Sequence, residues 1–197
     1  ANEYRNAGAF AALKSNGAVV TWGDISSGGD SSAVSGQLLS GNVALFSSTE
    51  AFAALKSDGS VVAWGNRFGG GDTSAVSGSL GSGVFSIAST EAAFAALKVG
   101  GSVVTWGAAT YGGDSSLVSN ALASGVLEVY STASAFAALK TNGAVVTWGD
   151  TNSGGDSSLI TGSIASGVVD LYPTMGAFAA LKTNGSVVTW GDSNSGG

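Results

Sequence analysis

Residues 9–23 read AFAALKSNGAVVTWG, and the chain repeats this stretch four more times. The later copies read AFAALKSDGSVVAWG, AFAALKVGGSVVTWG, AFAALKTNGAVVTWG and AFAALKTNGSVVTWG. Equivalent residues of successive copies are 42 positions apart, as the spacing of Phe10, Phe52 and Phe94 shows. Self-similarity at a fixed period of this length indicates a repeat architecture.

Each copy predicts a β-hairpin. The flanks are rich in Val, Phe, Thr and Trp, which favour strands, and the central pair favours a two-residue type I′ turn with positive φ at both positions. These pairs are Asn16-Gly17, Asp58-Gly59, Gly100-Gly101, Asn142-Gly143 and Asn184-Gly185. A two-residue loop fixes the register, so five facing pairs are expected in the first copy: Lys14 with Val19, Leu13 with Val20, Ala12 with Thr21, Ala11 with Trp22, and Phe10 with Gly23.

This register gives the hairpin two mainly apolar faces. Each large ring then lies across from a small residue and has room to cover its partner strand. A hairpin with one face in water would alternate apolar and polar residues. We therefore expect the neighbouring repeats to cover each hairpin on both faces.

The composition narrows the possible functions. The 197 residues include 32 Gly and one Pro but no Cys or His, and only 10% are charged. Disulfides, thiolate metal sites and histidine bases are therefore excluded. The net charge of −6 argues against nucleic acid and anionic membrane surfaces, and no apolar run approaches the ~20 residues of a membrane span. The sequence starts without a Met or a signal peptide, which indicates a mature chain or part of a longer one.

The period predicts one array of five units, at about 1–42, 43–84, 85–126, 127–168 and an incomplete 169–197. In each connecting segment a polar glycine loop precedes two apolar residues at i,i+4 spacing, such as Val34 and Leu38. This spacing after Asp-Ser-Ser fits a capped helical turn, and an irregular extended stretch is the alternative. A short third strand is predicted at Val43–Phe46, Val84–Ala88, Val126–Tyr130 and Val168–Tyr172.

Three strands per unit predict an all-β repeat protein, a β-propeller-like array with three-stranded blades. An open β-solenoid or superhelical array is the alternative, because the same units could stack along a line. The chain enters the period partway, since Tyr4 aligns with Tyr172. Glu3 stands where later units carry an apolar residue: Leu45, Ile87, Val129 and Leu171.

The order of these motifs resembles the repeat of the regulator of chromosome condensation family. The residues that carry the resemblance are Leu55, Asp58-Gly59, Val61-Val62 and Trp64-Gly65 with their period mates, followed by GGDSS-type loops. The resemblance covers the whole chain and implies a β-propeller, usually of about seven blades. The family's His before the LAL-type strand is absent, and only five hairpins are present.

Within that family, the short spacing and the step Ser124-Gly125-Val126 are most similar to the bacterial beta-lactamase-inhibitory propeller with three-stranded blades. Family members include an exchange factor for a small GTPase, light sensors and enzyme inhibitors. Their roles lie in loops that differ between members, so the resemblance implies a fold but no function.

Two rows of repeated polar residues have a functional and a structural interpretation. The lysine row could bind an anionic partner, but lysines that snorkel beside the turns are favoured; these are Lys14, Lys56, Lys98, Lys140 and Lys182. The aspartate row could bind calcium. Calcium needs about six or more oxygens, so a turn or cap aspartate is favoured at Asp30, Asp72, Asp114 and Asp156.

No residue set looks catalytic, and we predict no enzyme, no cofactor site and no metal site. The Trp row from Trp22 to Trp190 is favoured as core rather than as a sugar platform. The glutamates Glu3, Glu50, Glu91 and Glu128 are scattered, without the paired carboxylates of a glycosidase. A specific partner surface should use variable loop residues, for which the candidates are Arg67, Phe68, Tyr111, Asn152 and Met175.

Near-identical repeats of low charge favour a bacterial extracellular or cell-surface structural protein: a scaffold, adhesin or filament component. The alternative is a propeller that binds a protein or glycan through its variable loops. The two end units should expose apolar hairpin faces. We therefore expect covalent continuation into more repeats or head-to-tail self-association rather than an isolated closed monomer.

Overall fold

The structure, a computed structural model, describes residues 6–197. The first sheet within this range has two antiparallel strands, β1 (Ala9–Leu13) and β2 (Val19–Gly23). Four antiparallel three-stranded sheets follow. Their strands are β3 (Asn42–Ser47), β4 (Ala51–Lys56) and β5 (Val61–Gly65); β6 (Val84–Ser89), β7 (Ala93–Lys98) and β8 (Val103–Gly107); β9 (Val126–Ser131), β10 (Ala135–Lys140) and β11 (Val145–Gly149); and β12 (Val168–Pro173), β13 (Ala177–Lys182) and β14 (Val187–Gly191).

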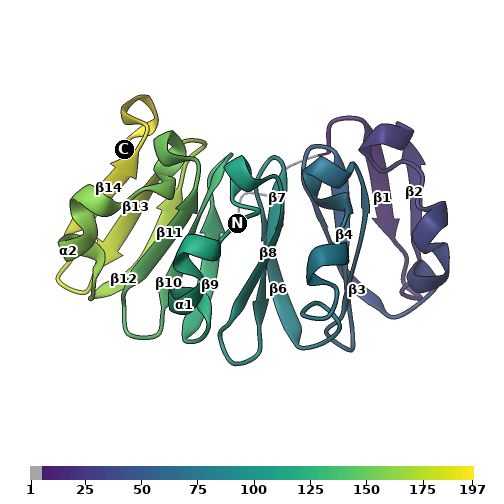
Figure 1. Ribbon diagram of the computed structural model, residues 1–197, viewed down its shortest axis with the longest axis horizontal. Coiled ribbons are helices and arrows are strands. Elements are labelled where there is room, and N and C mark those ends of the chain that lie inside the picture. Colours follow the sequence, from purple (N-terminus) through teal and green to yellow (C-terminus); the bar gives the residue numbers. More distant parts are fainter. Residues whose placement is uncertain (1–5) are drawn as a thin grey trace.

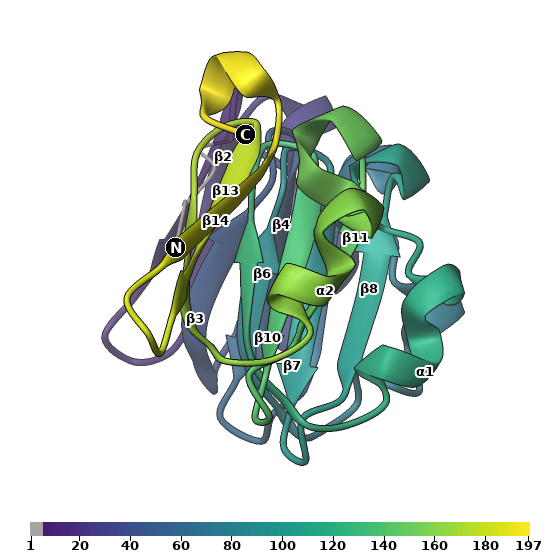
Figure 2. The same cartoon turned by 90° about the vertical axis from the view of Figure 1, so that its left-hand side faces the viewer.

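The five sheets stand side by side in a curved row (Figure 1). Figure 2 shows that the two end sheets lie on the same side of the molecule, with β8 on the opposite side, so the row is an arc. The first strands of the three-stranded sheets, β3, β6, β9 and β12, contact one another along the arc, and we call them the inner strands. This arrangement confirms the prediction of a propeller-like array with three-stranded blades.

The connecting segments are helical rather than extended. The predicted turn after Asp-Ser-Ser forms in every segment, as η2 (Ser32–Leu38), η4 (Ser74–Val76), η6 (Ser116–Val118) with α1 (Ser119–Leu122), and η8 (Ser158–Ile160) with α2 (Thr161–Ile164). Each turn buries one aliphatic side chain: Leu38, Leu80, Leu122 or Ile164. The glycine loops also form short helical turns, at η1 (Ile25–Ser27), η3 (Arg67–Gly71), η5 (Ala109–Tyr111), η7 (Thr151–Gly155) and η9 (Ser193–Ser195).

The predicted hairpin register is wrong by one residue. In the structure Phe10 pairs with Trp22 and Leu13 with Val19. Gly17 has a φ of +77°, but no residue other than glycine has a positive φ in the described part of the chain, so Asn16 does not fit a type I′ turn. The amide of Gly17 donates to the carbonyl of Lys14, and the amide of Lys14 donates to Ala18. This is a three-residue loop, a type I turn followed by a left-handed glycine, which moves the partner strand by one residue.

The corrected register places the two large rings of each hairpin opposite each other. Phe94 and Trp106 stack with ring centroids 5.2 Å apart, and the other four hairpins have the same stack at 5.3–5.4 Å. The expectation that each ring lies across from a small residue is therefore also wrong. One face of each sheet carries the stacked rings, and the other carries mostly small residues.

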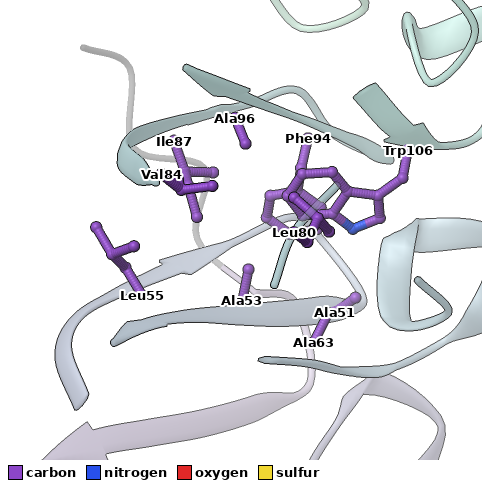
Figure 3. Close-up of a cluster of buried hydrophobic side chains, with 10 residues drawn as sticks. All are labelled: Ala51, Ala53, Leu55, Ala63, Leu80, Val84, Ile87, Phe94, Ala96 and Trp106. Atoms are coloured by element: carbon purple, nitrogen blue, oxygen red, sulfur yellow. The ribbon is translucent and has the colours of Figure 1, made fainter. Parts of the chain in front are cut away.

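Neighbouring sheets pack the ring face of one against the small-residue face of the other. Ala51, Ala53 and Ala63 of the second sheet share a buried cluster with Phe94 and Trp106 of the third. Figure 3 shows the alanines on one sheet facing the ring pair on the next, with Leu80 beside the rings. The same packing recurs in the other clusters. The core is thus a series of layers between sheets, as the two apolar faces predicted.

A backbone ladder also links the units at the loop between the inner and middle strands. The amide of Ala7 donates to the carbonyl of Thr49, that of Thr49 to Glu91, that of Glu91 to Ala133, and that of Ala133 to Met175, with N–O distances of 2.7–2.9 Å. These residues are period mates that differ widely in their side chains. The predicted alignment of Glu3 and Tyr4 with the inner strands lies outside the described residues.

Candidate functional site

The most regular feature of the molecule is the contact between successive units, which we call the joint. In each joint the indole Nε1 of a Trp donates to the carbonyl of a glycine in the preceding loop: Trp64 to Gly28, Trp106 to Gly70, Trp148 to Gly112, and Trp190 to Gly154, at 2.9–3.1 Å. A buried indole usually needs such a partner. The Trp row is therefore core, as predicted, and its polar atom links two units.

Each joint glycine also lies against an aromatic ring of the next unit. Gly70 has a φ of +100°, and a Cβ built on it would lie 2.6 Å from Cδ2 of Phe94. Both the left-handed backbone and the close approach require glycine here. The sequence predicted a polar glycine loop but gave no sign that this residue is half of a joint.

The two ends of the arc present the two halves of a joint. At the first sheet, Phe10 and Trp22 are 64% and 51% exposed, whereas their period mates are at most 5% exposed. At the other end, Gly196 has a φ of +98°, and a Cβ on it would meet nothing within 4 Å. The prediction that each end unit exposes an apolar hairpin face agrees with the exposed Phe10, Trp22 and Val187.

Four of the five lysines in the row hold the helical turns. Lys56 donates from Nζ to the carbonyls of Gln37 and Ser40 at 2.6 and 2.9 Å. Lys98, Lys140 and Lys182 make the equivalent bond to Ser79, Ala121 and Ser163. A cation at the end of a helical turn satisfies carbonyls that have no partner within the turn. The prediction that these lysines have a structural role is thus confirmed. The carbonyls that accept their hydrogen bonds were not predicted.

The aspartate row closes the glycine loops. Oδ1 of Asp114 accepts the amide of Ser116 at 2.9 Å, and Asp30, Asp72 and Asp156 accept the amides of Ser32, Ser74 and Ser158. This is the local bond by which aspartate favours turns. Among residues 6–197, no group of three His, Cys, Asp or Glu side chains is placed to hold a metal ion.

These backbone bonds lower the pKa of each of the four carboxyls, with the amide two residues further on as the main cause. A pKa that is lower in the folded state stabilises the fold above the ordinary aspartate range near about 4, and this stability is lost as pH falls through the folded pKa. We expect a melting temperature that is flat from about pH 7 to 5 and falls below about pH 4. The difference between wild type and Asp114→Asn should shrink over the same acid range. A constant difference would contradict the assignment.

The predicted partner residues lie along one edge of the arc, which we call the loop edge. It is the edge where the outer strands end and the middle strands begin, because Ala51 pairs with Gly65 and Ala177 with Gly191. Arg67, Phe68, Tyr111 and Asn152 lie in the glycine loops after the outer strands, and Met175 lies before β13. All are exposed except Tyr111, which is half-buried against a core cluster. Their role in binding stays a prediction.

One part of the loop edge is hollowed. The guanidinium of Arg67 lies 5.1 Å from the ring centroid of Phe68, and Phe68 is 70% exposed. Both residues line a groove of about 450 Å³ between the second and third sheets, which also contains Trp106 and Asp114. The cation lies over one face of the aromatic ring. The other face and the edge of this exposed ring are available to a ligand.

The sequence interpretation missed a polar cluster on the inner strands. The hydroxyl of Tyr130 lies 2.8 Å from a carboxylate oxygen of Glu128 and 2.9 Å from one of Asp170. Burial and the two carboxylates raise the pKa of Tyr130, and a hydrogen bond from Tyr172 is the main cause that lowers the pKa of Asp170. The sequence contains a sign of this cluster. One position of the repeat is uncharged in two units, as Ala44 and Ser86, but carries a carboxylate in the next two, as Glu128 and Asp170.

Comparison with solved structures identifies the architecture. Yeast RCC1 (Prp20), solved bound to Kap60, aligns over 95% of this chain and 55% of its own, with 18% identity and a TM-score of 0.57. The chain has the fold of an RCC1-like repeat propeller. The ectodomain of the Physcomitrella patens receptor kinase CR4 aligns with 16% identity and a TM-score of 0.55, over 95% of this chain. The CRINKLY WD40 ectodomain of Arabidopsis thaliana ACR4 has the same identity and TM-score, over 96% of this chain.

The RCC1-like array spans 51% of the CR4 chain and 70% of the ACR4 chain. No protein-family profile matches the sequence, and no curated protein sequence matches it. The finer resemblance to the bacterial beta-lactamase-inhibitory propeller stays a prediction. No helix within residues 6–197 is long and apolar enough to cross a membrane.

Proposed function

We propose that the RCC1-like array is a non-catalytic structural protein of the bacterial cell surface or extracellular space, and that it forms part of a scaffold, adhesin or filament. The observation that carries this proposal is the joint, which is made in the same way between every pair of successive sheets. Four of the five repeated Trp side chains and four of the five repeated Lys side chains hold units or turns together, and the repeated Asp side chains close their loops. A contact repeated identically along the chain holds an extended array together, whereas a reaction centre would need a set of residues that occurs once.

The composition is consistent with the same proposal. A chain without Cys has no thiol to oxidise, so an oxidising compartment such as the cell exterior imposes no disulfide chemistry on it.

The test is surface labelling of the source bacterium with an antibody raised against the 197-residue chain. We expect labelling of intact cells, and loss of that label after brief protease treatment of the cells. Labelling that appears only after lysis would overturn the surface assignment. A hydrolase screen that finds turnover, lost on replacing one carboxylate, would overturn the non-catalytic assignment.

The second candidate function is a binding module that uses the loop edge, and the exposed Arg67–Phe68 pair above its groove favours it. A printed glycan array tests this candidate with wild type, Phe68→Ser and the control Ile25→Ser, whose side chain is exposed in the first glycine loop. Specific binding that is lost only in Phe68→Ser would support it. Absent binding, or equal loss in both variants, would count against a glycan site here.

A further inference from the structure

We propose that a second copy of this chain docks head-to-tail on the arc, with the first sheet of one copy against the last sheet of the other. The proposal deepens the proposed scaffold function and rests on it by naming the partner and the contact. In the new joint, the indole of Trp22 donates to the carbonyl of Gly196 in the other copy, and the ring of Phe10 covers that glycine.

The internal joints show what the end faces fit. Within the chain, each ring pair of this kind is buried on the small-residue face of the preceding sheet. The last sheet exposes that face at Val187 and Thr189, whereas the equivalent Thr105 and Thr147 are buried. The end faces are therefore complementary to each other in shape and hydrogen bonding. Neither is complementary to itself, because two ring faces or two small-residue faces would leave the Trp donor or the glycine carbonyl unpaired.

Two further open positions support the same partner. Gly185 sits in the last hairpin turn, and a Cβ on it would meet nothing within 4 Å, whereas the equivalent Gly59, Gly101 and Gly143 lie against the next unit. Met175 ends the backbone ladder, in which each preceding period mate donates its amide to the next unit. A docked copy would offer the carbonyl of Ala7 to the amide of Met175.

Cysteine cross-linking tests the proposal directly, because the chain has no cysteine of its own. Successive period mates of the ladder are joined by amide-to-carbonyl bonds of 2.7–2.9 Å. We expect cysteines at such neighbouring positions to form a disulfide, which needs a Cα separation of about 4.4–6.8 Å. Ala7→Cys and Met175→Cys are placed in separate chains, and the two proteins are mixed and oxidised. We expect a disulfide-linked dimer in the mixture and far less in either protein alone. A third chain with Thr49→Cys and Glu91→Cys is the internal control, in which the same step closes within one chain.

The outcomes separate the alternatives. Absence of the mixed dimer while the 49–91 control closes would overturn the proposal. A double variant with Ala7→Cys and Met175→Cys in one chain that closes within a monomer would also overturn it, because the arc would then close on itself. Phe10→Ser with Trp22→Ser should abolish the mixed dimer and leave the control unchanged. Surface labelling of the bacterium is independent of these results, so the scaffold function and the docking can fail separately.

Discussion

Replacing Trp106 by alanine is expected to lower the free energy of unfolding by about 3–5 kcal/mol, the range for truncating a large buried aromatic side chain. Trp106 is buried, stacks on Phe94 and donates its indole N–H to Gly70 in the neighbouring unit. The variant therefore leaves a cavity between two sheets and an unpaired carbonyl at the joint. Urea unfolding followed by far-UV circular dichroism measures the loss.

Trp22→Ala is the matched control for this prediction. Trp22 has the same neighbour in its own hairpin, Phe10 at 5.4 Å, but half of its surface is exposed. Its removal should cost about 1 kcal/mol, the scale of an aromatic pair, when measured at low protein concentration. Equal losses at the two positions would show that the tryptophans do not form the packing layer. Because repeats unfold in part independently, Trp106→Ala could also split one transition into two.

Gly70→Ala is expected to destabilise the array by about 2–5 kcal/mol. A left-handed backbone costs an L-residue about 1–2 kcal/mol, and the added methyl would meet the ring of Phe94 at 2.6 Å. Overpacking of this kind typically costs about a further 1–3 kcal/mol. Calorimetric melting of the variant against wild type gives the measurement.

Gly196→Ala separates the two causes. Its φ of +98° nearly equals the +100° of Gly70, but a Cβ at Gly196 meets nothing within 4 Å. At a protein concentration low enough to keep the copies apart, the control variant should therefore show only the backbone cost, about 1–2 kcal/mol. If both variants lose the same stability, the contact between the glycine and the next ring contributes nothing to the joint.

The repeated hairpin, its cover on both faces and the buried Trp row could be predicted because they depend on side-chain pattern within one repeat. The register could not, because an Asn-Gly pair fits both a two-residue loop and a three-residue loop that ends in a left-handed glycine. The structure shows the three-residue loop through the hydrogen bond from the amide of Gly17 to the carbonyl of Lys14. A single residue in a loop thus decided whether Phe10 faces Gly23 or Trp22.

The contacts between units were harder to predict. The acceptor of Lys98 is 19 residues away and the acceptor of Trp106 is 36 residues away, in segments whose path the pattern left open. The choice between a helical turn and an extended stretch at Val34 and Leu38 depended on whether Leu38 would be buried beneath a neighbouring sheet. The cluster at Tyr130 needs two inner strands to lie side by side, which periodicity alone does not specify.

The backbone ladder from Ala7 to Met175 has a consequence for how such a gene can change. Each rung is a bond between main-chain atoms, to which the Thr49 hydroxyl adds a second bond to the carbonyl of Glu91, so Ala, Thr, Glu and Met can all stand at a rung. A recombination event that adds or deletes one whole repeat therefore inserts or removes a rung without needing any compensating substitution. The array can therefore gain or lose whole repeats while each junction keeps the same main-chain bonds, and the side chains at the rungs remain free to differ.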